Sequence, residues 1–497
     1  MAIQPEYGNI RISGKTQIPA VQVKAECKTE IPSDTVSKVL DVSAFCGGAE
    51  CSAEPPFKIS GTVIFNVIYC DAEGKVKKCE CAQEFTRELS EDLEGKTFIP
   101  SASILKAGAD VSGTRLTLSA VLSVGGKIIF SSDVACLSGG EGIIVNEDEK
   151  IVYKSLGVKR SVFPVEEEFT LPYEIAEVLS QKVVARLTEV HCGVGALIVD
   201  GEANLTALLL QNSENGDIIK EEKVLPFRFE LESDEVMPKN LASAEVAVRS
   251  LRSDVSVDPE TGKSTVTVLV ALAVIGEAFA EETALTVNDA FSTSEKTELT
   301  FAQAEFCIPD GIKQEKRSVT GRCPVGIPAG ASVIAAYGET AEITSLKTDK
   351  NINIVGVYSL KAIYRDADGK VGSVSMETPF EFKEEKPAQA DIVGVSLYAT
   401  GGKIRPISEN ESELSGDVVI YITFTKTQKI KFASGITAVG EKPINNAAVS
   451  VYIPLEGEGL FSLAKRLNTA PDDLAAANKD LTFPLTGKER IVIYRQK

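Results

Sequence analysis

Apolar and polar residues alternate along most of this chain, and clusters of turn residues interrupt the alternation at short intervals. A period of two is typical of β-strands with one buried face, because successive side chains point to opposite sides of a sheet. Clear examples are ISGTVIFNVIY (59–69), TRLTLSAVLSV (114–124), STVTVLVALAVIG (264–276) and SGDVVIYITFT (415–425). The pattern predicts a mainly β protein with antiparallel strands.

A strand-turn-strand unit recurs along the chain. IYCDAEGKV (68–76) returns as IYRDADGKV (363–371). The first copy has the landmarks Gly61, Tyr69, Gly74 and Phe85, and the later copy has Gly356, Tyr364, Gly369 and Phe380. A third, weaker copy begins at Gly201 and is two residues longer. The spacing predicts three tandem β-sandwich-like domains at 1–147, 148–297 and 298–440, because it is far too long for a solenoid repeat.

The pattern changes after a linker at 441–448. Leu460, Leu463, Ala464 and Leu467 have helical spacing, and Ala470-Pro471-Asp472-Asp473 has the proline and acidic residues of a helix start. We therefore expect a small α+β domain at 449–497, with a strand, two helices and a closing strand. Its seven Lys and Arg against six Asp and Glu give a charge near +1, so the remainder carries about −20.

Composition excludes several classes of function. The chain has 497 residues and a formal charge of −19, which argues against a nucleic-acid partner and against anionic membranes. The sequence shows neither a signal peptide nor a transmembrane segment, so we expect a cytoplasmic location. Ten cysteines are too sparse for a disulfide scaffold and indicate reduced thiols, and the single histidine weighs against an enzyme.

Acidic residues before glycine raise the question of calcium binding. In the copies containing Gly74 and Gly369, the position of the first calcium ligand holds Tyr69 or Tyr364, which favours a hairpin turn. The Gly-Lys-Ser of VDPETGKST (257–265) lacks the first glycine of a phosphate-binding loop and also indicates a hairpin.

The cysteines and the histidine are weaker candidates. Cys79 and Cys81 suggest zinc, but Val374 and Met376 replace them in the later copy, which favours packing against a core. His191 and Cys192 are neighbours in a strand and point to opposite faces, so they do not form a catalytic pair. We expect no enzymatic activity, no cofactor and no metal.

The C-terminal domain resembles a LysM domain. Gly457-Glu458-Gly459-Leu460-Phe461 stands where that family has Gly-Asp-Thr-Leu-Trp, and Ala477-Asn478 and Gly487 through Ile493 match later positions. LysM domains commonly bind N-acetylglucosamine polymers such as peptidoglycan. The resemblance implies a groove for a partner or a glycan formed by Gly457, Glu458, Gly459, Leu460, Phe461, Asn478 and Pro484. Gly459 and Phe461 depart from the family and favour a protein ligand.

The three copies are similar to SPOCS domains, through Ile-Tyr-x-Asp-Ala-[Asp/Glu]-Gly-Lys-Val and the following Pro-Phe-x-Phe at Pro379 to Phe382. SPOCS domains followed by a LysM domain are the arrangement of SipL-like spore morphogenetic proteins of clostridia. The resemblance implies a non-enzymatic scaffold in the mother cell, located at the forespore surface and needed for coat assembly. Its LysM module would bind the coat-basement ATPase, besides contacts with other coat proteins. The alternative is a cell-wall or cortex protein that binds peptidoglycan through LysM.

Overall fold

Most described residues lie in antiparallel strands. The structure is a computed structural model that describes residues 3–31, 36–213, 216–388, 392–443 and 447–494. Within these ranges the strands form six three-stranded sheets and one two-stranded sheet, and two short helices lie near the C-terminal end. The prediction of a mainly β protein is confirmed. Neither helix is long and apolar enough to cross a membrane.

The three-stranded sheets occur in three groups with the same pairing. The first group contains β1 (Gln4–Glu30), β2 (Lys38–Cys51), β3 (Lys58–Cys70), β4 (Val76–Glu88), β5 (Thr97–Ser112) and β6 (Arg115–Glu141). Its sheets have the strand orders β1-β6-β5 and β2-β3-β4. They share one apolar core, to which β3 and β6 each contribute a row of fully buried residues.

The second and third groups repeat these connections. The second contains β7 (Ile144–Leu171), β8 (Ile175–Cys192), β9 (Ala196–Gln211), β10 (Ile218–Glu232), β11 (Leu241–Val257) and β12 (Ser264–Phe291). The third contains β13 (Glu295–Cys323), β14 (Ser332–Thr348), β15 (Asn351–Arg365), β16 (Val371–Glu385), β17 (Ile392–Ser408) and β18 (Glu411–Glu441). In each group the first strand pairs with the sixth, and the second, third and fourth form a meander.

The glycine and phenylalanine landmarks are cross-strand pairs. Gly61 lies opposite Phe85, Gly201 opposite Phe227, and Gly356 opposite Phe380. A Cβ atom on these glycines would lie 2.8, 2.3 and 2.4 Å from the facing ring. The ring therefore lies over the glycine backbone, and this packing fixes the spacing that the sequence repeats.

The repeated Asp-Ala-acidic-Gly segments are hairpin turns, as predicted. The Asp71 carboxylate accepts hydrogen bonds from the backbone N–H groups of Glu73 and Lys75, both at 2.9 Å, and Gly74 has a φ of +80°. Asp366 makes the same bonds, and Gly369 has a φ of +82°. These carboxylates stabilise the turn itself.

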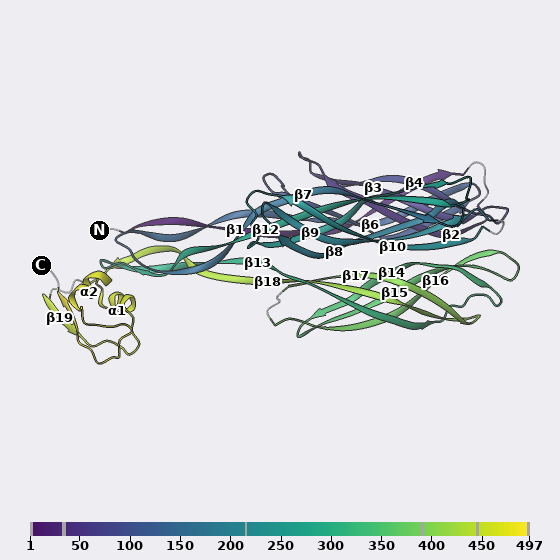
Figure 1. Cartoon of the computed structure of the whole chain (residues 1–497). Helices are drawn as coiled ribbons and strands as arrows, with labels where there is room; N and C mark the ends of the chain where they lie inside the picture. Colours follow the sequence, from purple (N-terminus) through teal and green to yellow (C-terminus); the bar gives the residue numbers. More distant parts are fainter. Residues whose placement is uncertain (1–2, 32–35, 214–215, 389–391, 444–446, 495–497) are drawn as a thin grey trace.

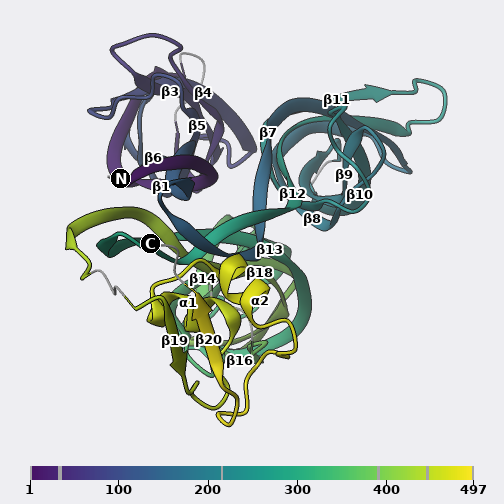
Figure 2. The same cartoon turned by 90° about the vertical axis from the view of Figure 1, so that its left-hand side faces the viewer.

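The three groups meet at a shared apolar centre. Each second strand has a β-bulge at the same place in its register, and the extra residues are Leu40, Leu179 and Ile334. They pack with Ile68, Leu208 and Ile363, which occupy matching positions in β3, β9 and β15. A bulge turns a side chain out of the regular alternation, and here all three extra residues reach one common cluster. Figure 2 shows that the three groups are arranged side by side around one long axis.

Polar contacts between groups surround the centre. Asn66 donates a 2.8 Å hydrogen bond to the carbonyl of Leu179, which joins the first group to the second. Lys220 forms an ion pair with the buried Glu339, which joins the second group to the third. Lys361 forms a 2.5 Å ion pair with the buried Asp41, which closes the ring. Each group therefore contacts both others.

The outer halves of the long strands extend beyond the sandwiches as three two-stranded ribbons, formed by β1 with β6, β7 with β12, and β13 with β18. The ribbons converge toward one end of the molecule (Figure 1). Buried residues from different ribbons pack together there, namely Ile10, Leu137, Val152, Val287, Phe306, Phe432 and Ile436. The ribbon end of the molecule thus has apolar clusters of its own.

The prediction of reduced thiols is wrong for two cysteines. The structure joins Cys27 of β1 to Cys81 of β4 by a disulfide, while the other eight cysteines are free. The two residues come from facing sheets of the first group, a contact that spacing in the sequence does not reveal. Cys79 packs against the same core, as predicted.

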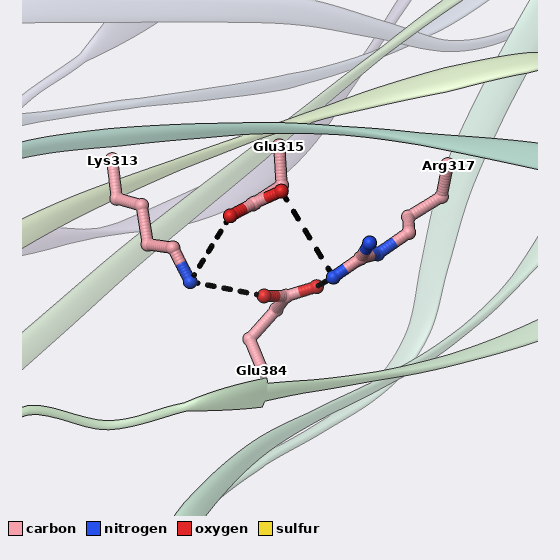
Figure 3. A network of polar contacts seen from close by, with 4 residues as sticks. All are labelled: Lys313, Glu315, Arg317 and Glu384. Atoms are coloured by element: carbon pink, nitrogen blue, oxygen red, sulfur yellow. Dashed lines mark hydrogen bonds and ion pairs between the residues drawn. The ribbon is translucent and has the colours of Figure 1, made fainter.

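A buried carboxylate organises a polar network in the third group (Figure 3). Glu384 is 3% exposed and accepts hydrogen bonds from Arg317 Nη2 at 2.7 Å and Lys313 Nζ at 3.1 Å, with Glu315 beside both cations. Burial by itself would raise the pKa of Glu384, but these hydrogen bonds outweigh burial and lower that pKa below its usual value.

We predict that Leu179→Ala strongly destabilises the whole molecule. Leu179 is 0% exposed where the three groups meet, and a cavity at such a site costs about 2–5 kcal/mol. The midpoint of urea unfolding should fall accordingly. Val194→Ala is the control, because Val194 is 80% exposed. Equal midpoints for both variants would contradict the central role of Leu179.

We predict that the contribution of Glu384 to the stability of the fold is lost at acid pH. Its folded pKa is depressed, so its contribution is complete above the usual glutamate pKa and is lost as pH falls through the lower folded pKa. Glu384→Gln should lower the unfolding temperature at neutral pH, and the difference from wild type should shrink on acidification. An unfolding temperature difference that stays constant with pH would refute the assignment.

Candidate functional site

The C-terminal residues form a separate small unit, called here the tip module (447–494). It contains β19 (Val449–Tyr452), α1 (Leu460–Leu467), α2 (Pro471–Ala477) and β20 (Ile491–Tyr494) in that order. β19 and β20 pair antiparallel, and the helices pack on one face of this sheet. The core of the module consists of Leu463, Ala464, Leu467, Leu474, Leu485, Ile491 and Ile493.

The helix boundaries follow local chemistry. Gly459 is the N-cap of α1, and its backbone N–H donates to Ser462 Oγ at 3.1 Å. α1 ends at Leu467, and its C-cap Asn468 adopts the left-handed conformation with a φ of 54°. α2 begins with Pro471, followed by Asp472 and Asp473 in its first turn, where carboxylates are favoured by the helix dipole.

Glu458 stabilises the loop before α1 from within the module. Its carboxylate is 5% exposed and accepts two 2.8 Å hydrogen bonds from Arg466, and a third bond from the backbone N–H of Leu455 at 2.9 Å. The Arg466 hydrogen bonds hold the pKa of Glu458 below its usual value, and burial opposes this only in part. Both carboxylate oxygens are therefore committed to internal bonds.

The loop containing Pro484 lies beside the loop before α1. The backbone N–H of Gly457 donates to the carbonyl of Leu485 at 2.8 Å, and the N–H of Leu485 donates to the carbonyl of Glu458 at 3.0 Å. Pro484 itself is exposed. The structure thus brings together the segment Gly457 to Phe461 and Pro484.

Asn478 has a different position, at the end of α2. Its amide nitrogen donates to the carbonyls of Leu474 and Val492 at 2.8 and 2.7 Å, and its amide oxygen accepts the N–H of Val492 at 2.8 Å. These bonds tie α2 to β20, so the polar atoms of Asn478 are already used inside the module.

The tip module is fixed to the end of the β12 ribbon (Figure 1). The ring of Phe461 packs edge-on against Phe291, with 5.3 Å between ring centroids, and Leu460 also contacts the apolar cluster around Phe291. Lys465 forms a 2.5 Å ion pair with Asp289. Phe461 therefore lies in an intramolecular contact that no pattern in the sequence indicates.

Hydrogen bonds complete this docking contact. Asn468 donates through its amide to the carbonyl of Thr293 at 2.7 Å. Lys442 donates to the carbonyl of Ser292 at 2.6 Å and to the Asn468 amide oxygen at 2.8 Å. The contact combines aromatic packing, an ion pair and backbone hydrogen bonds, so it holds the module in one orientation.

The outer face of the module is apolar and uncovered. The residues that point away from the helices alternate along β19 and the segment after it, and they are Val449 (54% exposed), Val451 (61%), Ile453 (70%) and Leu455 (63%). Tyr494 of β20 lies opposite Val449 and is 68% exposed. Contiguous exposed apolar residues of this kind mark interaction surfaces. The alternation of apolar residues in VSVYIPL is the sequence signal for this face.

Searches against known protein families, curated proteins and solved structures found no match to this chain.

We predict that Phe291→Ala releases the tip module from the ribbon. Removing one ring eliminates the central apolar contact, and truncating a buried phenylalanine costs about 3–5 kcal/mol. Nuclear magnetic resonance relaxation should then show the module tumbling faster than the rest of the chain. Phe301→Ala is the control, because Phe301 lies 43% exposed on a ribbon surface. Unchanged relaxation in Phe291→Ala would refute the docking contact.

Proposed function

We propose that the three strand groups are tandem copies of one domain of the SPOCS kind, with boundaries near 147, 297 and 440, and that the tip module is a LysM domain. The identical strand pairing of the groups and the matching bulges at Leu40, Leu179 and Ile334 support the repeat. The order strand, helix, helix, strand supports the LysM assignment.

On this basis we propose a non-enzymatic scaffold for spore coat assembly. It would act at the forespore surface in the mother cell, and its LysM module would bind the coat-basement ATPase. The observation that carries this proposal is the uncovered apolar face of Val449, Val451, Ile453 and Leu455 at the end of an elongated body. A face of exposed apolar side chains suits a folded protein partner better than a glycan, which needs hydrogen-bonding groups.

The polar groups of the expected groove also favour a protein partner over a glycan. Glu458 and Asn478 use their side-chain polar atoms for bonds within the module, and Phe461 packs against Phe291. A glycan would need such groups to be free for stacking and hydrogen bonding. Peptidoglycan binding is therefore the less favoured alternative.

We predict that capture of the coat-basement ATPase requires the tip module and its apolar face. A chain that ends near Gly440 should lose capture in a pull-down, and the double variant Val451→Asp and Ile453→Asp should do the same, because charges oppose burial of this face. Val194→Asp is the matched control, since Val194 is exposed in the turn between β8 and β9, outside the tip module. The module is nearly neutral, so salt should weaken capture only slightly.

Two outcomes would overturn the proposal. Capture that survives removal of the module would show that LysM is not the binding element. Co-sedimentation with purified peptidoglycan that depends on residues 449–497 would instead support the glycan-binding alternative.

A further inference from the structure

Three potential metal ligands gather on the outer face of the second strand group. Glu189 and His191 come from β8, and Asp200 comes from β9. One ligand atom of each side chain lies within 4.8 Å of the other two. Their exposed side-chain fractions are 70%, 40% and 24%, so the group is open to solvent on one side. This is the only such group among the described residues.

Two carboxylates of this group face each other. Glu189 lies directly opposite Asp200 in the strand register, and like charges at that position destabilise a sheet. His191 Nδ1 is buried and has no hydrogen bond, although it lies only 3.5 Å from a Glu189 oxygen. A cation bound between this imidazole nitrogen and the carboxylate oxygen would give Nδ1 a partner.

We propose that Glu189, His191 and Asp200 bind a divalent metal ion of the zinc class. Zinc accepts histidine nitrogen and carboxylate oxygen at about 2.0–2.2 Å, which requires the ligand atoms to move closer than they are now. The exposed Glu189 side chain can make this movement. Imidazole selects zinc, cobalt or nickel over magnesium and calcium, and water fills the open position.

A neighbouring arginine competes for one ligand. Arg228 Nη1 of β10 donates to both oxygens of Asp200, at 3.2 and 3.3 Å. Its positive charge neutralises Asp200 in the metal-free protein and opposes the incoming cation. Removing this charge should therefore strengthen metal binding.

The other two strand groups lack this set of ligands at the matching positions. The pair that corresponds to Glu189 and Asp200 is Glu50 and Ser60 in the first group and Ser345 and Val355 in the third. The chain contains one histidine in all. The site thus belongs to the second group alone, and it is independent of the proposed scaffold function.

The single histidine permits a direct experiment on the full-length chain without a histidine tag. Protein labelled with ¹³C at histidine Cε1 should give one imidazole resonance, and titration with zinc should shift it in a saturable manner. Magnesium and calcium should leave it in place. Isothermal titration calorimetry of the same protein gives the dissociation constant and the stoichiometry.

Variants distinguish a specific zinc site from nonspecific binding of zinc to the protein surface. His191→Asn and Asp200→Asn should each weaken zinc binding about 10–100-fold or more. Arg228→Gln should tighten it about 2–5-fold, in line with the strength of an exposed ion pair. Glu230→Gln is the matched control, because Glu230 is an exposed acid of β10 outside the group. An unshifted histidine resonance, or equal zinc affinity in His191→Asn and wild type, would overturn the proposal.

Discussion

Burial of apolar side chains where the three strand groups meet is the interaction on which the rest of the molecule depends. Leu40, Leu179 and Ile334 leave the regular alternation of their strands at matching bulges and pack with residues of the other groups. Around this centre, Lys220 and Lys361 form ion pairs with residues of neighbouring groups. This centre brings the three ribbons to one end of the molecule, where the end of β12 receives the tip module.

The sequence revealed features that depend on near neighbours. Each Asp-to-Gly turn is stabilised by hydrogen bonds between the Asp side chain and the backbone of the same turn. Each landmark glycine faces a phenylalanine on the next strand. Both features therefore recur in the sequence with a fixed spacing. The loop from Gly457 to Phe461 is likewise continuous in sequence, which is why these expected site residues lie together. Strand alternation gave the mainly β class for the same reason.

Contacts between distant segments were not predictable. A bulge residue such as Leu179 follows the same alternation as its neighbours until the partner strand is known. The packing of Phe461 on Phe291 and the bond between Cys27 and Cys81 join segments with no shared sequence signal. Glu458 was expected to face a ligand, but its bonds to Arg466 depend on how α1 returns beside the loop.

The unbroken course of β12 has a mechanical consequence. This strand begins in a sandwich core and ends at Phe291, where the tip module is attached. Its hydrogen bonds to β7 run across the strand direction, so a pull on the module along the ribbon loads many of them together in shear. Tension applied at the module is thereby shared along the strand and reaches the sandwich, while no single bond bears it alone.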